Sequence, residues 1–229
     1  MLTKRLMAVK DAVGKCDTLF DVGTDHGYVP ISLIMDKKVK YAVASDVNQG
    51  PIENAKKNID NMGLGGVIET RISDGISSMR DNEADVVVIA GMGGILISKI
   101  LDKDIKKSRT VKTFILQPMN SSDVLRKYLY ENDFKIIKEI AVSEDDKVYN
   151  ILKVVNEKDK AYEKESMYYI GRPELFDLDN NETRIYINSK KEQYGRALEG
   201  LLKAENKDYS KINLYKEIIE LAEEFYESK

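Results

Sequence analysis

Residues 18–30, TLFDVGTDHGYVP, constrain the fold of this chain more than any other stretch. An apolar run ends at Asp21, Val22 and Gly23 form a tight turn, and an apolar helix begins close to Pro30. A buried strand that ends in an acid and turns through glycine into a helix is typical of doubly wound α/β proteins that hold a nucleoside-bearing cofactor. The question that the rest of the sequence must answer is which cofactor this turn serves.

Strand-like and helix-like segments alternate through the first part of the chain. Besides the strand at 18–21, strands are predicted over residues 39–45, 67–73, 84–90 and 113–117. Helices are predicted after a capping Thr3 and over residues 28–35, 52–62, 95–101 and 121–132, the last capped by Ser121 or Ser122.

The hydrophobic pattern of two of these strands indicates where each lies in the sheet. The run ADVVVIA at 84–90 is continuously apolar, which indicates burial on both faces near the centre of a parallel sheet. The run at 67–73 alternates and should lie nearer an edge, while residues 134–142 and 148–155 predict a closing hairpin. The predicted fold class is therefore α/β, a Rossmann-like and mostly parallel sheet with a terminal antiparallel hairpin.

The chain changes character after residue 156. Residues 157–165 are charged and resemble a linker, and from residue 181 the sequence is helical, with a break near 207–208. In the last helix a heptad seam is predicted at Ile212, Tyr215, Ile219, Ala222 and Tyr226, beside a second stripe at Leu214, Ile218, Leu221 and Phe225. We expect two domains, 1–156 with the sheet and 157–229 as an antiparallel helical hairpin of coiled-coil type.

Composition excludes several classes of protein. Cys16 is the single cysteine and His26 the single histidine, which excludes an internal disulfide and a Cys/His zinc site, and we expect no metal. No run approaches the roughly 18 apolar residues that span a bilayer. We expect a cytoplasmic protein without a membrane partner. The net charge of −3 gives no support for nucleic-acid binding, although local basic patches matter more than the sum.

Acids at the strand ends favour one cofactor over others. Three of the first four predicted strands end at Asp21, Asp46 and Asp74, and the carboxyl ends of parallel strands meet the ligand. Asp25 stands where a pyrophosphate fingerprint has its second glycine, and its charge would repel a phosphate. The chain also lacks a phosphate-binding loop of the G-x-x-x-x-G-K-[ST] type. A cofactor with an amine and a ribose but no phosphate fits better, which predicts S-adenosyl-L-methionine.

The segments DVGTDHGYVP, ASDV, SDGI, IAGMGG and LQP, preceded by TKRL, resemble the bacterial tRNA (adenine-22)-N1-methyltransferase family. This resemblance runs through the whole chain and implies a class I methyltransferase domain followed by a C-terminal coiled-coil hairpin. It also implies S-adenosyl-L-methionine as methyl donor and tRNA as partner. Departures are small: Thr24 and Gly27 stand where serine and alanine are common, and Met119 replaces a typical asparagine.

The candidate site residues fall into three groups. Those predicted to contact the cofactor are Asp21, Gly23, Thr24, Asp46, Val47, Asp74, Gly75, Ala90 and Gly91. Those predicted to act at the reaction centre are Asp25, His26 and Tyr28. Those predicted to contact the substrate are Lys4, Arg5, Met92, Gly93, Gln117 and Pro118. Each has a structural alternative: a cap or turn for the acids, a turn for the glycines, and packing for the aromatic residues.

The chemistry that the resemblance implies is methyl transfer to N1 of an adenine. N1 carries an in-plane lone pair, so catalysis depends mostly on positioning, with Asp25 as the candidate that stabilises the cationic product or accepts an N6 proton. The fourth strand is followed by AGMGG and not by an N-P-P-Y motif, which argues against methylation of an exocyclic amine.

Three questions stay open at this level. The lysines and arginines of residues 99–112 and of the helical hairpin form either an RNA-binding track or a solvated surface. The hairpin serves either tRNA or dimerisation, and a monomer is favoured. Two other functions also remain: a class I methyltransferase for a small molecule or protein, and a non-catalytic adenosine-binding module.

Overall fold

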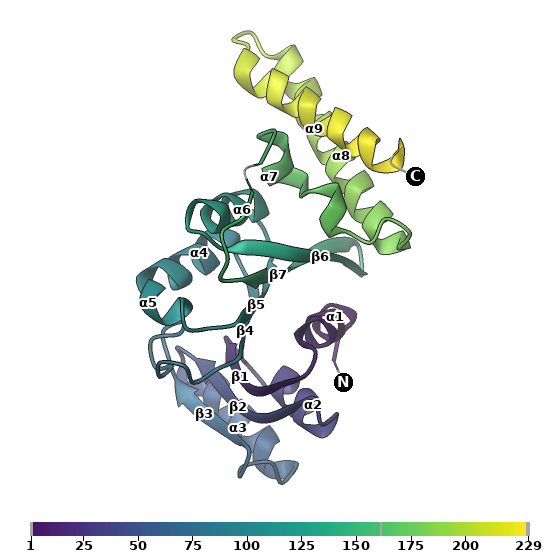
Figure 1. Ribbon diagram of the computed structural model, residues 1–229. Coiled ribbons are helices and arrows are strands. Elements are labelled where there is room, and N and C mark those ends of the chain that lie inside the picture. The colour runs from purple at the N-terminus through teal and green to yellow at the C-terminus, as the bar shows by residue number, and fades with distance from the viewer. Residues whose placement is uncertain (1, 161, 228–229) are drawn as a thin grey trace.

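The computed structural model describes residues 2–160 and 162–227 and contains a seven-stranded sheet in the order β3-β2-β1-β4-β5-β7-β6 (Figure 1). The first five strands are mutually parallel, and β7 pairs antiparallel with both β5 and β6. The strands are β1 (Cys16–Val22), β2 (Val39–Asp46), β3 (Ile68–Ile72), β4 (Val86–Met92), β5 (Thr113–Pro118), β6 (Lys135–Glu144) and β7 (Lys147–Val155). The predicted α/β class, the edge position of the third strand, the central position of the fourth and the closing hairpin are confirmed.

Helices cover both faces of the sheet. On one face lie α1 (Lys4–Val13), α2 (Tyr28–Met35) and α3 (Gln49–Asn61), which bury residues such as Val9, Leu33 and Ile59 against the strands. On the other lie α4 (Gly94–Lys103), α5 (Ile105–Ser108) and α6 (Ser122–Glu131), with Leu101 and Leu125 in their core. None of the helices in the described residues is both long and apolar enough to cross a membrane.

Helix caps follow the sequence only in part. Thr3 caps α1 as predicted, since its hydroxyl accepts a hydrogen bond from the backbone N–H of Leu6 at 3.4 Å. Ser121 is the residue before α6, but it adopts a left-handed backbone with φ of 52° and its side chain makes no capping hydrogen bond. The prediction that a serine side chain, of Ser121 or Ser122, caps α6 is therefore wrong. Ser121 occupies the N-cap position, but its left-handed backbone keeps the side chain from accepting a capping hydrogen bond.

The C-terminal part consists of α7 (Ser166–Ile170), the 3₁₀ helix η1 (Pro173–Leu175), α8 (Asn181–Lys203) and α9 (Tyr209–Glu227). The last two form the predicted antiparallel hairpin, because Lys191 of α8 pairs with Glu223 near the end of α9 at 2.8 Å (Figure 1). The predicted heptad seam is wrong at Tyr226, which is 39% exposed, while Phe225 from the other stripe is buried. The face of α9 that packs is thus drawn from both stripes, and coiled-coil geometry stays a prediction.

The hairpin is joined to the sheet through a buried ion pair. Arg126 of α6 and Glu139 of β6 have fully buried side chains, and Arg126 Nη2 lies 2.7 Å from Glu139 Oε2. The guanidinium also donates to the carbonyls of Tyr168 at 2.8 Å and Ile170 at 3.2 Å, and to the hydroxyl of Tyr186 of α8 at 3.1 Å. One buried side chain therefore holds α6, β6, α7 and α8 together.

Removing one partner of this pair should destabilise the protein strongly. The substitution Glu139→Ala leaves the Arg126 guanidinium buried without its counter-charge, and we expect a loss of about 3–5 kcal/mol in the free energy of unfolding. Urea unfolding followed by circular dichroism measures it.

The matched control is Lys127→Ala, which removes the exposed Lys127–Glu131 pair of the same helix. That pair should contribute less than about 1 kcal/mol. Equal losses for the two variants would show that the buried pair does not hold the hairpin to the sheet.

Candidate active site

The end of β1 and the first residues of the turn after it, 21–24, form the floor of a cavity of about 310 Å³ at the carboxyl end of the sheet. Asp21 is 5% exposed, and its carboxylate accepts a hydrogen bond of 2.7 Å from the hydroxyl of Thr24. Gly23 has φ of 74°, and a Cβ there would lie 2.5 Å from the Met92 side chain. Glycine is therefore required at this turn both by backbone conformation and by the close approach of β4.

Burial dominates the ionisation of Asp21. Desolvation raises the pKa of this carboxyl to about 6, although the hydrogen bond from Thr24 acts in the opposite direction. In the described part of the chain no cation pairs with Asp21. Because the pKa in the folded state exceeds the ordinary value of 3.8, stability that is present at low pH is lost as the pH rises through about 6. The site therefore holds a buried carboxylate that a bound cation would stabilise.

Asp25, His26 and Tyr28, the residues predicted to act at the reaction centre, lie together at the mouth of this cavity. Asp25 adopts φ of 46°, and its side chain is 68% exposed, with Oδ2 3.5 Å from Nε2 of His26. The rings of His26 and Tyr28 stack with 5.1 Å between their centres. The turn is anchored from α3, where Asn58 donates to the carbonyl of His26 at 2.9 Å. An accessible carboxylate and two aromatic rings thus face solvent beside the buried Asp21.

The acids Asp46, at the end of β2, and Asp74, just after β3, lie along the same edge of the sheet but outside the lining of this cavity. Asp46 ends β2 and accepts a hydrogen bond from the backbone N–H of Asn48 at 2.8 Å, and Val47 beside it is exposed. Asp74 is exposed and pairs with Lys103 of α4 at 2.6 Å. Asp74 is therefore held by a lysine that the sequence analysis had placed in a possible RNA track.

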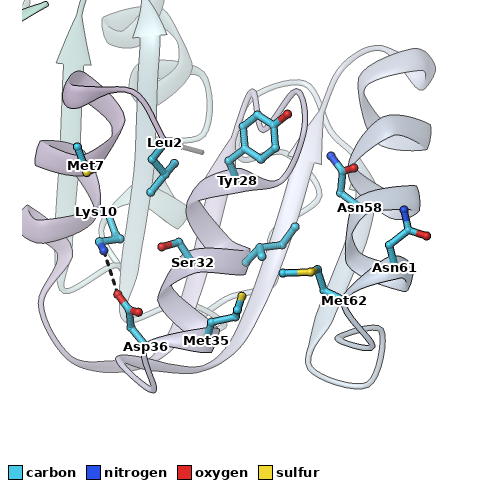
Figure 2. Close-up of a pocket in the computed structure, with 11 residues that line it drawn as sticks. Leu2, Met7, Lys10, Tyr28, Ser32, Met35, Asp36, Asn58, Asn61 and Met62 are labelled. Atoms are coloured by element: carbon cyan, nitrogen blue, oxygen red, sulfur yellow. Dashed lines mark hydrogen bonds and ion pairs between the residues drawn. The ribbon is translucent and has the colours of Figure 1, made fainter.

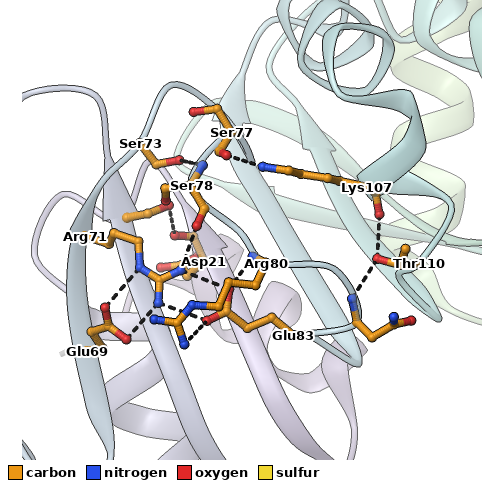
Figure 3. Close-up of polar contacts among 12 residues, drawn as sticks. Asp21, Glu69, Arg71, Ser73, Ser77, Ser78, Arg80, Glu83, Lys107 and Thr110 are labelled. Carbon is orange, nitrogen blue, oxygen red and sulfur yellow. Dashed lines mark hydrogen bonds and ion pairs between the residues drawn. The ribbon is translucent and has the colours of Figure 1, made fainter.

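The loop that carries Asp74 and Gly75 is fixed by a polar cluster centred on Arg71 (Figure 3). The Arg71 guanidinium bonds to Glu83 at 2.9 Å, to Glu69 at 2.7 Å and to the carbonyl of Ser78 at 2.9 Å. Lys107 donates to the carbonyl of Ser77 from the other side of the loop. These bonds hold residues 73–83 in place, so the loop presents a pre-formed edge next to β2.

A β-bulge shapes the other side of the cavity. The pairing of β4 with β5 shifts between Ala90 and Met92, which leaves Gly91 with φ of 78° and its N–H turned to Gln117 Oε1 at 3.0 Å. The predicted end of this strand at Ala90 is therefore wrong, because β4 continues through the bulge to Met92. Bulges commonly redirect backbone groups beside active sites.

Arg5 of α1 completes this wall. Its Nη1 donates to the same Gln117 oxygen at 2.7 Å, and Gln117 is fully buried. Glu144, at the end of β6, accepts a hydrogen bond from the Arg5 backbone N–H at 3.0 Å and lies 3.8 Å from its guanidinium. Glu144 is not recognisable as a site residue from the sequence, because its partner Arg5 lies far away in the chain, on the N-terminal helix.

The remaining predicted substrate contacts lie next to this wall. Gly93 precedes α4, and Pro118 ends β5 opposite Met92. The backbone N–H of Met119 donates to the carbonyl of Met92 at 2.8 Å, which ties the two strand ends together. Lys4 is exposed at the first turn of α1.

Basic residues of the 99–112 segment are largely paired within the chain. Besides the contacts of Lys103 and Lys107, Lys112 pairs with Asp85 at 2.6 Å, and Arg109 lies 4.3 Å from the centre of the Phe134 ring. These contacts favour the reading of this segment as structural surface. The segment therefore offers little unpaired charge for RNA.

A larger cavity lies elsewhere. A groove of about 600 Å³ lies between α1, α2 and α3. Figure 2 shows the side chains that line it, most of them apolar, such as Leu2, Met35 and Met62. Tyr28 borders both this groove and the cavity at the strand ends. The groove is lined by helices α1, α2 and α3, whereas open α/β sheets bind their ligands at the carboxyl ends of the strands, where the smaller cavity lies.

Comparisons with known proteins agree with this geometry. A family model described as a methyltransferase domain matches residues 2–152. A tRNA (adenine(22)-N(1))-methyltransferase of Bacillus subtilis is 34% identical over 163 residues, which cover 71% of this chain and 68% of the relative.

Solved structures extend the similarity beyond the sheet. The Bacillus subtilis tRNA methyltransferase TrmK superposes with a TM-score of 0.84 at 26% identity, over 98% of both chains. The Streptococcus pneumoniae protein Sp1610 in complex with S-adenosyl-L-methionine gives a TM-score of 0.82 at 33% identity, over 96% of this chain and 100% of its own. The chain belongs to the methyltransferase domain family and, within it, to the family of the tRNA (adenine(22)-N(1))-methyltransferases.

Proposed function

We propose that this protein transfers the methyl group of S-adenosyl-L-methionine to N1 of adenine 22 in tRNA. The observation that carries the proposal is the buried Asp21 carboxylate in a cavity beside the bulged turn at Gly91, in a chain that belongs to this family. The reaction takes place on tRNA, and we place it in the cytoplasm.

The residues of the cavity fit the cofactor. Asp21 is a buried carboxylate with only a neutral partner, Thr24, and the ammonium group of S-adenosyl-L-methionine would supply the missing positive charge. The turn at Gly23 and the backbone at Ala90 and Gly91 leave room for the methionine portion. Further along the strand ends, Asp46 and Val47 would hold the ribose and Asp74 and Gly75 the adenine edge. When bound, the cofactor supplies an electrophilic methyl group.

The protein groups around the acceptor base mainly position it. N1 of adenine needs no deprotonation before it attacks, so the contribution of this site is to hold the base in line and to exclude other orientations. Asp25 is exposed at the cavity mouth, where its carboxylate can stabilise the cationic product and accept a proton from N6. His26 and Tyr28 offer ring faces for an unstacked base. Lys4, Arg5, Met92, Gly93 and Pro118 would border that base. Gln117 is fully buried, so its predicted contact with the substrate is replaced by a positioning role behind Arg5 and Gly91.

Two further assignments belong to the proposal. We take residues 1–156 as the catalytic domain and residues 157–229 as the helical hairpin that contacts tRNA. The match of the methyltransferase domain model to residues 2–152 supports this boundary. Because N1 lies on the pairing edge of adenine, the enzyme acts on a base that is unpaired or flipped out.

Methyl transfer to unmodified tRNA tests the function directly. We expect label from methyl-labelled S-adenosyl-L-methionine to enter tRNA that contains adenine 22, and nucleoside analysis to place it on N1. A tRNA in which guanine replaces adenine 22 is the matched control and should take up almost no label. Equal incorporation into both substrates would contradict the specific assignment.

Cofactor affinity should depend on the ionisation of Asp21. Because the pKa of this buried carboxyl is about 6 in the protein without cofactor, most of it is protonated at pH 5 and cannot pair with an ammonium group. We expect the dissociation constant for S-adenosyl-L-methionine, measured by calorimetry, to rise roughly tenfold between pH 7 and pH 5. In Asp21→Asn the affinity should be weak and nearly constant over this range. The same pH dependence in wild type and variant would exclude Asp21 as its source.

Asp25 should affect turnover more than cofactor binding. In Asp25→Asn the carboxylate becomes a neutral amide of the same size, and we expect kcat to fall by roughly 10²–10⁴-fold, the range of acid–base contributions. The affinity for S-adenosyl-L-methionine should stay within a few-fold, because Asp25 lies at the mouth and not on the floor of the cavity. Undiminished kcat in this variant would leave Asp25 no chemical role.

A further inference from the structure

A second polar cavity, of about 280 Å³, lies where the helical hairpin meets the sheet. It is enclosed by residues 118–123 after β5, by the start of β7 and by α8. It contains no residue of the cofactor cavity. Its volume is slightly below the roughly 300–1,000 Å³ of sites for drug-sized ligands, which suits a single nucleoside.

The side chains of this junction cavity combine hydrogen-bonding and aromatic groups. Asn150 of β7 is 4% exposed, and its Nδ2 donates to Glu139, but its buried Oδ1 has no hydrogen-bond partner among the described residues. Asp123 adds a second acceptor, Tyr149 and Tyr194 add ring surface, and Lys190 adds a cation. A carboxylate acceptor beside aromatic rings matches the exocyclic amine and flat face of a nucleobase.

The junction cavity is close to the reaction centre. Pro118 ends β5, one strand from β4, and Asn150 lies on β7, the next strand along. Strand spacing places β7 roughly 10 Å from β4 and its bulge at Gly91. The two cavities also share a wall, because the Arg5 guanidinium lies 5.6 Å from the centre of the Tyr149 ring. One single-stranded segment of RNA can therefore reach both cavities.

We propose that the junction cavity binds an unpaired nucleoside of the tRNA other than the adenine that is methylated. The proposal rests on the proposed function and deepens it, because it assigns to α8 and β7 a specific contact with the same substrate. The bound base stacks against a tyrosine, and its exocyclic amine donates to the Asp123 carboxylate. Binding in this cavity fixes the register of the RNA strand, so that the target adenine enters the cofactor cavity.

A cavity-filling substitution tests the proposal in the full-length protein. Ser189 lines the cavity from the exposed side of α8, and Ser189→Trp places an indole in the space of the nucleoside. Asn188→Trp is the matched control, since Asn188 is an exposed neighbour on α8 that does not line the cavity. Urea unfolding and the affinity for S-adenosyl-L-methionine should be the same for both variants, because neither residue is in the core or the cofactor cavity.

Binding is measured with two RNAs, the unmodified tRNA and the same tRNA with an abasic site at position 22. We expect Ser189→Trp to weaken the binding of both RNAs by roughly tenfold, as the loss of one stacked base predicts, and Asn188→Trp to change neither. Equal affinities of the two variants would overturn the proposal. So would a loss for the unmodified tRNA alone, because the cavity would then hold the target base.

These outcomes are independent of the test of function. If the wild-type protein binds the tRNA but transfers no methyl group to it, the proposed reaction fails while the junction cavity can still be tested by binding.

Discussion

The buried Arg126–Glu139 pair is the interaction on which the arrangement of the other parts depends. A charge pair with no exposed surface is favourable only when its remaining donors and acceptors are also satisfied. Here the Arg126 guanidinium also donates hydrogen bonds to the carbonyls of Tyr168 and Ile170 and to the hydroxyl of Tyr186. The Glu139 carboxylate accepts a further hydrogen bond from Asn150. The buried Arg126 guanidinium therefore needs α7 and α8, which follow the sheet in the chain, to complete its hydrogen bonds.

This attachment also reaches the candidate active site. Glu182, in the first turn of α8, accepts a hydrogen bond from the backbone N–H of Ser143 at 2.6 Å. The next residue, Glu144, holds Arg5, which in turn orients Gln117 beside Gly91. A continuous series of polar contacts thus leads from the base of the helical hairpin to the bulge beside the cofactor cavity.

Much of the fold and part of the site follow from local sequence. The valine-rich run of β4, the glycine turn after Asp21 and the order of strands and helices depend on neighbouring residues, and these predictions are confirmed. The bulge at Gly91 and the pairing of Asp74 with Lys103 were not predicted, because each depends on a residue far away in the sequence.

Dependence on distant residues also explains why the segment that follows the sheet was not predicted correctly. The segment 157–165 looks like a linker by composition, yet its Asp159 is buried and pairs with Arg172 at 2.6 Å. From sequence alone a charged residue is predicted to be exposed, because a buried charge needs a partner that the sequence does not identify. Glu144 and Asn150 gained their roles in the same way, through partners on α1 and β6.

These contacts bear on where the catalytic domain ends. A chain cut after Asn156 would keep all seven strands but would remove Tyr168, Ile170 and Tyr186 from around the Arg126 guanidinium. If such a chain lost tRNA binding, the cause could be the unsatisfied buried charge of Arg126 as well as the loss of an RNA contact. The role of the hairpin is therefore separated from its structural role only by substitutions on its exposed side, which leave the buried pair intact. The proposed boundary at residue 156 therefore does not separate independent folding units, because the contacts of Arg126 cross it.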